Sequence, residues 1–364
     1  MLTLLIFILI LGLLVFVHEL GHFLLAKKFG MRVEEFGFGF PPRLFEAKRG
    51  ETVYSINLIP LGGFVKIAGE DGGLREDHGS FTAKSYGRRA LVLVAGVTMN
   101  ILLAALLFSL GYKIGAPQIV DGEIQGNMKN PKIQILEITA DSPAADAGFQ
   151  VGDILRKINN QDISEVSETQ KAIAGQAGQE TDFFVARGKE LLTLKAIPRS
   201  KFPPGDGPLG VGLVKTAIIS YSLPRAIKEG FQDTAYALKL ITTTFYHLLA
   251  DMIISGKVSA DLSGPIGVAV MTSRASQMGF VYLLQFTALL SVNLAIINIL
   301  PIPALDGGRL LFLAIESVRR RPLNQKVEQW VNTAGFAGLI ILMLLVTFRD
   351  VFRFGLVSKI GNLF

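Results

Sequence analysis

The sequence predicts an α-helical polytopic membrane protein with four transmembrane helices, a membrane-associated β element and one inserted α+β domain. Half of its 364 residues are hydrophobic, and four apolar runs approach the ~20 residues that a helix needs to cross a bilayer. A glycine-rich segment of alternating polar and apolar residues follows the first run, and a longer, more polar segment separates the second run from the third. The sequence contains no cysteine, which excludes disulfides and thiolate metal ligands.

The first apolar run predicts a transmembrane helix over residues 1–27, and it contains the pattern His18-Glu19-Leu20-Gly21-His22. On a helix, residues four apart share one face, so both imidazoles can bind one metal ion while the Glu19 carboxylate lies beside it. Zinc suits such a site, and Glu19 could take a proton from a zinc-bound water. A chance pentapeptide is the alternative, but an ionisable cluster inside an apolar helix is costly and usually functional.

The distribution of lysine and arginine predicts how the helices are oriented. We expect transmembrane helices at 1–27, 87–112, 281–308 and 331–348. Basic clusters follow the first helix, precede the second and follow the third, and such clusters usually lie in the cytosol. Residues 28–86 and the loop 309–330 are therefore expected inside, and residues 111–280 outside. Arg349, Arg353 and Lys359 follow the fourth helix and disagree, but a short tail weighs less than three clusters.

The flanking cations also account for the net charge of +6, so the bilayer is the expected partner and nucleic acid is not.

The third apolar run is interrupted by the sequence NILPIPALDGG at 298–308. Its prolines remove backbone donors and its glycines permit sharp turns, so a plain lipid-facing helix is excluded here. A zinc site with two histidines needs a third protein ligand, and Asp306 is expected near the same membrane depth as His18. Two alternatives stay open at this point: Asp306 as an ordinary helix N-cap, and His247 as the third ligand.

These motifs together resemble the site-2 protease family of intramembrane zinc metalloproteases, in particular its bacterial regulator of sigma-E protease branch. The motifs occur in family order along nearly the whole chain: HELGH at 18–22, IPLGGFVK at 59–66, LSGPIGV at 262–268 and SVNLAIINILPIPALDGGRLLF at 291–312.

The resemblance implies that Zn2+ is held by His18, His22 and Asp306, with Glu19 as the catalytic acid/base. It further implies that Asn293 and Asn298 help to handle substrate. The implied substrates are single-pass membrane proteins, such as anti-sigma factors or remnant signal peptides, cleaved in the bacterial cytoplasmic (inner) membrane.

One stretch departs from the family pattern. Family members often show Gly-Pro-x-x-Asn in the second span, whereas this chain reads GVTMN at 96–100, without the proline. The departure weakens an assumption about packing rather than the predicted chemistry.

Three further regions are considered next, each with a possible part in the same activity. Residues 28–86 alternate as short strands, and an exposed strand edge there could pair with an unwound substrate; a hairpin without a substrate role is the alternative. Residues 116–215 resemble a circularly permuted bacterial PDZ domain, which could bind extended peptides or act as a size filter. Residues 216–280 predict an amphipathic helical linker that either gates access or only connects.

Two functions other than a protease are possible for such a chain, and the sequence favours neither. A non-catalytic PDZ-containing membrane adaptor with a structural metal would have no need of Glu19 between the histidines. A metal transporter would need ionisable residues along several spans, and these spans offer mainly Asn100, Ser291 and Asn293.

Overall fold

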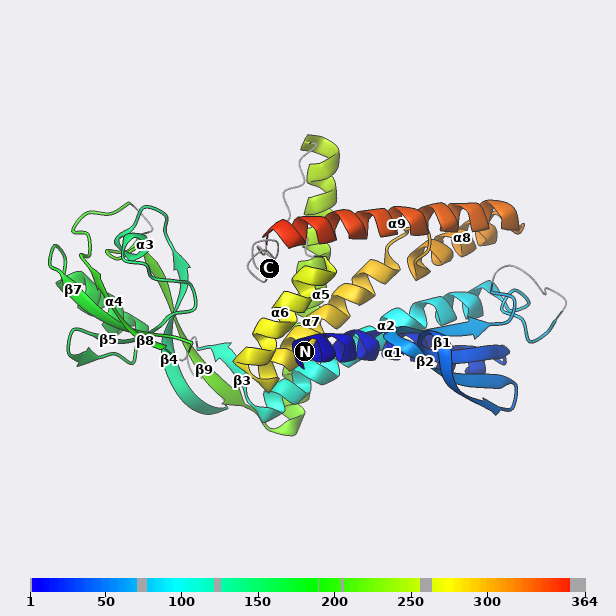
Figure 1. The fold of residues 1–364 in the computed structure, drawn as a ribbon, viewed down its shortest axis with the longest axis horizontal. Coiled ribbons are helices and arrows are strands. Elements are labelled where there is room, and N and C mark those ends of the chain that lie inside the picture. The colour runs from blue at the N-terminus through cyan, green and yellow to red at the C-terminus, as the bar shows by residue number, and fades with distance from the viewer. Residues whose placement is uncertain are drawn as a thin grey trace, which may run out of the picture. The chain divides into compact units, whose positions relative to one another are not determined.

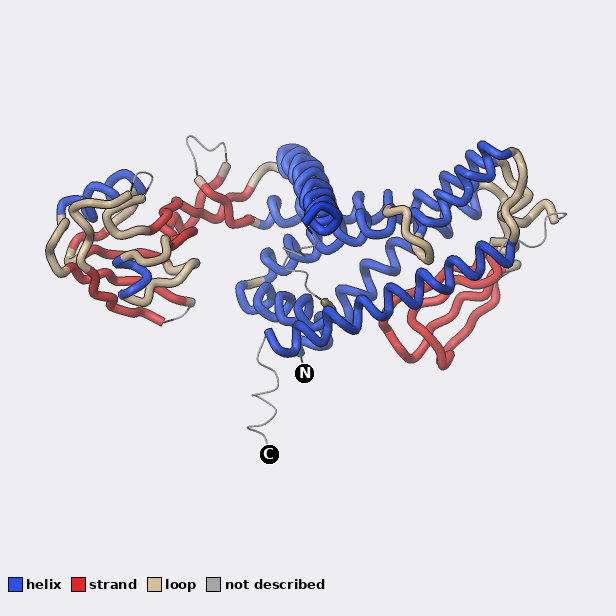
Figure 2. The backbone as a smooth tube through the Cα atoms, turned by 90° about the horizontal axis from the view of Figure 1, so that it is seen from above, coloured by secondary structure: helices blue, strands red, loops and turns tan. Residues whose placement is uncertain are grey.

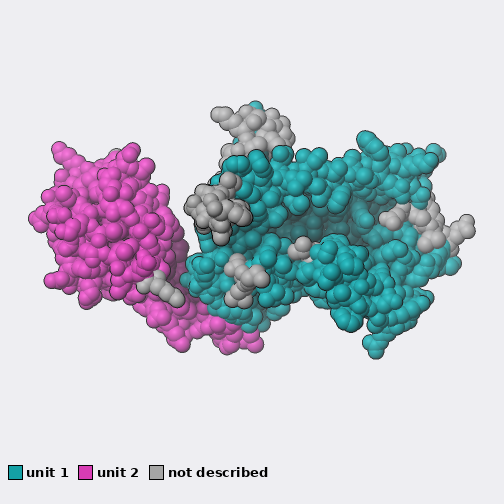
Figure 3. All heavy atoms as spheres, in the orientation of Figure 1, with its two compact units in different colours: residues 1–111, 227–364 teal, residues 112–226 magenta. Residues whose placement is uncertain are grey.

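The computed structural model describes residues 2–70, 77–120, 126–188, 190–203, 206–255 and 264–353. The chain divides into two compact units, residues 1–111 with 227–364, and residues 112–226 (Figure 3). Within the described residues, four helices of the first unit are long and apolar enough to cross a membrane. They are α1 (Leu2–Lys28), α2 (Tyr86–Ile114), α7 (Phe280–Ile299) and α9 (Gln325–Arg353) (Figure 1).

Close packing of small and branched side chains joins α1, α2, α7 and the amphipathic helix α5 (Leu223–Ser255). Ala104 of α2 and Ala288 and Val292 of α7 are completely buried in this contact. Because lipid is as apolar as these side chains, helix association in a bilayer depends on close van der Waals packing, which small residues permit. This packing brings α2 and α7 against the helix that contains the two histidines.

A small antiparallel sheet, formed by β1 (Val33–Arg49) and β2 (Thr52–Ile67), packs on the C-terminal half of α1. Figure 2 shows it in red beside the helices of the first unit. The register shifts repeatedly, so that residues 35–38 of β1 lie opposite both residues 53–56 and residues 63–66 of β2. The segment 63–66 therefore has β1 on one side, and its other edge is turned toward α1.

The helix bounds differ from the expected ones where the chain interrupts the third span. The expected helix 281–308 ends at Ile299, and a separate helix, α8 (Asp306–Arg319), begins after a six-residue turn. The expectation of a loop at 309–330 was wrong in its conformation, because most of that segment is helical: α8 runs to Arg319 and α9 begins at Gln325. The reason is amphipathic spacing, since Leu310 and Leu313 pack into a core with the end of α1 and the sheet.

The second unit is a seven-stranded sheet with strand order β3-β9-β4-β5-β7-β8, in which β6 also pairs with β5. Helices α3 (Pro143–Asp146) and α4 (Val166–Gly175) accompany it, and Phe183, Ile133 and Leu155 are among its most buried side chains. The strands are β3 (Ala116–Ile119), β4 (Asn127–Ile138), β5 (Ile154–Ile158), β6 (Gln161–Asp162), β7 (Thr181–Arg187), β8 (Glu190–Ala196) and β9 (Val211–Ser220).

The expected amphipathic helical linker 216–280 is largely helical where it is described, and it differs from the expectation at its start. The last strand of the second unit continues to Ser220, and helices α5 and α6 (Pro265–Met278) follow it. Residues 256–263, which include the start of the LSGPIGV motif, and Lys359 lie outside the described residues.

Candidate metal centre

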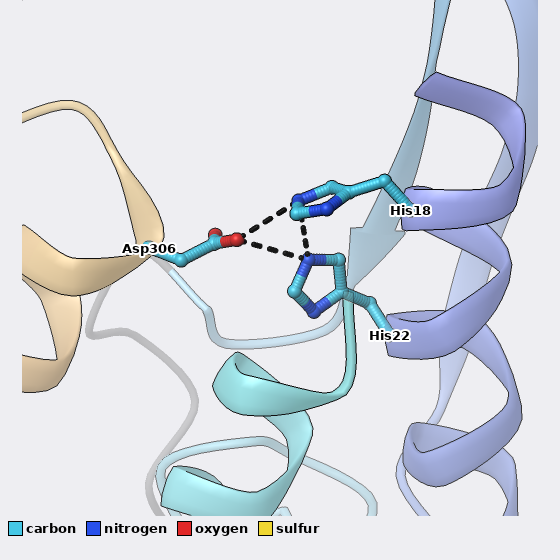
Figure 4. A group of neighbouring side chains, drawn as sticks. All are labelled: His18, His22 and Asp306. Carbon is cyan, nitrogen blue, oxygen red and sulfur yellow. Dashed lines mark hydrogen bonds and ion pairs between the residues drawn. The ribbon is translucent and has the colours of Figure 1, made fainter. Parts of the chain in front are cut away.

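Two histidines and one carboxylate meet at a single point in the first unit (Figure 4). The Nε2 atoms of His18 and His22 are 3.2 Å apart, and Oδ2 of Asp306 lies 2.9 Å from the first and 3.3 Å from the second. The three candidate ligand atoms all lie within 4.8 Å of one another. Both imidazoles are buried, with His18 5% exposed and His22 6% exposed.

The helical spacing of HExxH explains how one half of this cluster forms. His18 and His22 are one turn apart on α1, so their rings project from the same face toward α8 (Figure 4). The ring centroids are 4.8 Å apart with an interplanar angle of 80°, which aims both Nε2 atoms at one position.

The interrupted third span supplies the other half. After α7 ends, Ala304 adopts a left-handed φ of 74° and donates its backbone N–H to Oδ1 of Asn332 at 3.1 Å. Asp306 then begins α8, and Gly307 packs so closely that a Cβ there would overlap the carbonyl oxygens of Ile299 and Leu300. The tight turn therefore fixes where the Asp306 carboxylate projects, and only glycine fits next to it.

Two ion pairs join α8 to neighbouring elements. Arg309, in its first turn, pairs with Glu70, which follows β2. Glu316, nearly buried, pairs at 3.1 Å with Arg89 of α2. Both pairs lie between elements that flank the cluster, so they restrict the position of the helix that begins with Asp306.

The helix α2 orients the two imidazole rings. Nδ1 of His22 donates to the carbonyl oxygen of Val92 at 2.8 Å, and Nδ1 of His18 lies 3.3 Å from the side-chain amide of Asn100. Between these contacts, Gly96 packs against both rings, and a Cβ there would overlap Nε2 of His22. The role of Val92 was not predicted, because a backbone carbonyl has no sequence signature. The spacing of Gly96 and Asn100, one helical turn apart, was the available signal.

The donor set fits a bound metal ion. A hydrogen bond from Nδ1 of His22 to a carbonyl leaves the lone pair on its Nε2, which is the arrangement found in most metal-binding histidines. Three atoms that can each present a lone pair then converge on one buried point, where a cation would be stabilised. Two nitrogens and one carboxylate oxygen match the ligand preference of zinc and leave a fourth tetrahedral position for water.

Glu19 lies beside the cluster rather than in it. Its Oε2 accepts a hydrogen bond from the backbone N–H of Val65 at 3.1 Å, which turns the carboxylate toward the free edge of β2. A Cβ built on Gly63 would lie 3.7 Å from Cγ of Glu19. The carboxylate is therefore placed between the three candidate ligands and a strand edge.

The remaining predicted residues lie at different distances from this point. Nδ2 of Asn298 is 3.3 Å from Nε2 of His18, so its amide reaches the cluster. Asn293 lies on the same helix, and its Oδ1 is buried without a hydrogen-bond partner among the described residues. His247 is exposed on α5 and stacks against Tyr246, outside the cluster formed by the described His, Asp and Glu residues.

Comparison with known proteins assigns the family. The sequence model of peptidase family M50 matches residues 6–342, which is most of the chain. The chain belongs to peptidase family M50. This membership confirms the resemblance to site-2 proteases and the prediction of a peptidase.

Relatives of this M50 peptidase match over nearly their full length. The zinc metalloprotease RasP of Geobacillus kaustophilus is 32% identical, with 96% of this chain and 97% of the relative covered. A putative zinc metalloprotease of Clostridium perfringens, CPE1693, is 35% identical, with 93% and 95% covered. The regulator of sigma-W protease RasP of Bacillus subtilis is 31% identical, with 96% and 98% covered.

A solved PDZ domain from an SdrC-like protein of Listeria monocytogenes is 18% identical and matches 26% of this M50 peptidase and 93% of its own chain, with a TM-score of 0.21. A score this low carries no argument about the fold of the second unit.

Proposed function

We propose that this M50 peptidase is an intramembrane zinc metalloendopeptidase that cleaves the transmembrane segments of single-pass membrane proteins. The observation that carries the proposal is the convergence of Asp306, at the start of α8, with His18 and His22 beside Glu19. The two histidines and Glu19 lie on α1, a helix long and apolar enough to cross a membrane. The zinc-metalloprotease names of the full-length relatives support the choice of metal.

The chain's own residues divide the work at this centre. Two imidazole Nε2 atoms and a carboxylate oxygen of Asp306 would hold the zinc, which supplies Lewis-acid activation of a water and of the scissile carbonyl. Glu19 takes the proton of the attacking water on a carboxylate oxygen and delivers it to the nitrogen of the leaving amine. The amide of Asn298 lies close enough to donate a hydrogen bond to a bound substrate carbonyl.

The free edge of β2 suits an unwound substrate. A peptide bond inside a helix is shielded by its own hydrogen bonds, so a substrate must be extended before it can be cut. Residues 63–66 lie beside Glu19 and could pair with an extended segment by strand addition. This edge would hold the scissile bond next to the carboxylate that acts on it.

The distribution of basic residues supports a proposal for the orientation of the protein in the membrane. We propose a bacterial cytoplasmic membrane location, with the metal centre near the cytosolic side and the second unit, PDZ-like and extracytoplasmic, acting as a peptide binder or a size filter. Anti-sigma factors and remnant signal peptides are the proposed substrates. The name of the Bacillus subtilis relative, regulator of sigma-W protease RasP, supports the anti-sigma factors.

The proposal is tested by separating metal binding from proton transfer. Glu19→Gln keeps the shape of the side chain but removes its basicity, so we expect one zinc per chain and cleavage of a tagged single-span substrate reduced at least about 10²-fold. His22→Ala and Asp306→Ala should instead lower the bound zinc. Substantial cleavage by the Glu19 variant, or full zinc in both ligand variants, would contradict the proposed roles. A protein that binds zinc but cleaves nothing would favour the adaptor function.

A further inference from the structure

The side chain of Asn100 has no role in the proposed mechanism, although it is buried beside His18, a proposed zinc ligand. It is 0% exposed, its Nδ2 lies 3.3 Å from Nδ1 of His18, and its Oδ1 has no hydrogen-bond partner among the described residues. Its backbone is fixed as well, because the hydroxyl of Ser291 on α7 donates to the Asn100 carbonyl at 2.8 Å. An amide placed this firmly in an apolar helix contact calls for a physical reason.

The protonation of His18 provides that reason. A neutral imidazole carries one proton, and a ring that binds a metal through Nε2 must carry it on Nδ1. The Nε2 of His18 is the atom that faces Asp306 and His22. Nδ1 of His18 must therefore be a donor whenever the metal is bound, and it needs an acceptor at the position of the Asn100 amide.

The two orientations of the Asn100 amide differ in what they offer His18. With Nδ2 toward the ring, as placed, an N–H donor would face a second N–H donor. Rotating the amide by 180° changes its outline very little, since oxygen and nitrogen are nearly the same size, and presents Oδ1 instead. In either orientation the other amide atom points to where the described residues offer no partner. Among the described residues, the contact with His18 therefore decides which orientation of the Asn100 amide is preferred.

We propose that Asn100 is a positioning residue whose amide oxygen accepts the Nδ1–H of His18 and thereby holds this ring in its zinc-binding tautomer. Val92 performs the same task for His22 through its carbonyl oxygen, so α2 fixes both histidine ligands from one face. The inference rests on the proposed metal centre and adds the source of its ligand orientation.

Zinc affinity of purified full-length protein, measured by competition with a chromophoric chelator, tests this role. Asn100→Leu has a similar size but no acceptor, and we expect its zinc dissociation constant to rise about 10- to 100-fold. Asn100→Asp keeps an acceptor oxygen and should bind zinc at least as tightly as the unchanged protein. Thr98→Val is the matched control, because Thr98 is exposed on the same helix and bonds only within it, to Val94.

A second measurement uses the unchanged sequence and does not depend on any variant folding. The chain has four histidines, so nitrogen-15 labelling of histidine gives a small set of ring signals in the zinc-loaded protein. We expect His18 to carry its proton on Nδ1, hydrogen bonded to the Asn100 oxygen.

Equal zinc loss in the Leu and Asp variants, unchanged affinity in the Leu variant, or an unprotonated Nδ1 would each overturn the inference while leaving the metal centre standing. A protein that binds no zinc at all would overturn both.

Discussion

Gly96→Ala tests whether the close approach of α2 to the two histidines is required. A methyl group at this position would lie 2.7 Å from Cε1 and 2.8 Å from Nε2 of His18, and it would also overlap Nε2 of His22. Ordinary contact begins at 3.4 Å, so the helix must move about 0.7 Å away from the His18 ring and about 1 Å away from Nε2 of His22, the closest atom. Both rings are buried and hydrogen bonded to residues of α2, Val92 and Asn100, so they cannot simply turn away.

A shift of this size is expected to damage catalysis more than folding. A displacement of about 1 Å at a catalytic centre costs on the order of 10²-fold in rate. Disturbing the residues that orient the metal ligands weakens metal binding about 10- to 100-fold. Both quantities are measurable on protein in detergent, with a tagged single-span substrate and a zinc chelator. Gly87→Ala is the matched control, because it lies on the same helix and its Cβ would have nothing within 4 Å. If Gly96→Ala bound zinc and cleaved substrate as well as Gly87→Ala, the packing argument would be refuted.

Three further outcomes are expected. Arg187 contacts both oxygens of the buried Asp153 carboxylate at 2.8 Å, so Arg187→Met leaves that charge unpaired. We expect the free energy of unfolding of the second unit to fall by about 3 kcal/mol, and limited proteolysis to cut this unit sooner. An unchanged proteolysis profile would contradict this expectation. Asp350→Leu removes the carboxylate that accepts the N–H groups of Gly264 and Gly267 at 2.8 and 2.7 Å, which should cost about 1–3 kcal/mol in thermal unfolding, whereas Asp350→Asn should lose less. Removing the metal with a chelator should abolish cleavage, and adding zinc back should restore it. Cleavage by protein shown to be free of zinc would exclude the mechanism.

The sequence predicted those elements that depend only on residues close together in the chain. The HExxH spacing needs only a helix to place two imidazoles together, and an uninterrupted apolar run is enough to predict that helix. Asp306 could be named as a candidate third ligand because the neighbouring prolines and glycines mark an interruption where the backbone must turn. The helical conformation after it was missed, since the arginines of 309–330 indicated a cytosolic loop while Leu310 and Leu313 already had helical spacing.

Contacts between distant segments could not be read in the same way. Nothing in the sequence around Val92 indicates that its carbonyl accepts from His22, because every residue carries such an oxygen. The double pairing of residues 35–38 in the small sheet was equally hidden, since alternation predicts strands but not which strand lies beside which. The position of Val65 beside Glu19 follows from that register and became visible only with the fold.

The separation of 288 positions between His18 and Asp306 has a consequence for biosynthesis. A ribosome releases the first helix into the bilayer long before the segment that completes the ligand set has been made. During that interval the growing chain has both histidines of the proposed metal centre but not its carboxylate, so the proposed centre is incomplete while the rest of the chain is being made. With this proposed ligand set, peptidase activity would begin only after Asp306, late in the 364-residue chain, has been translated.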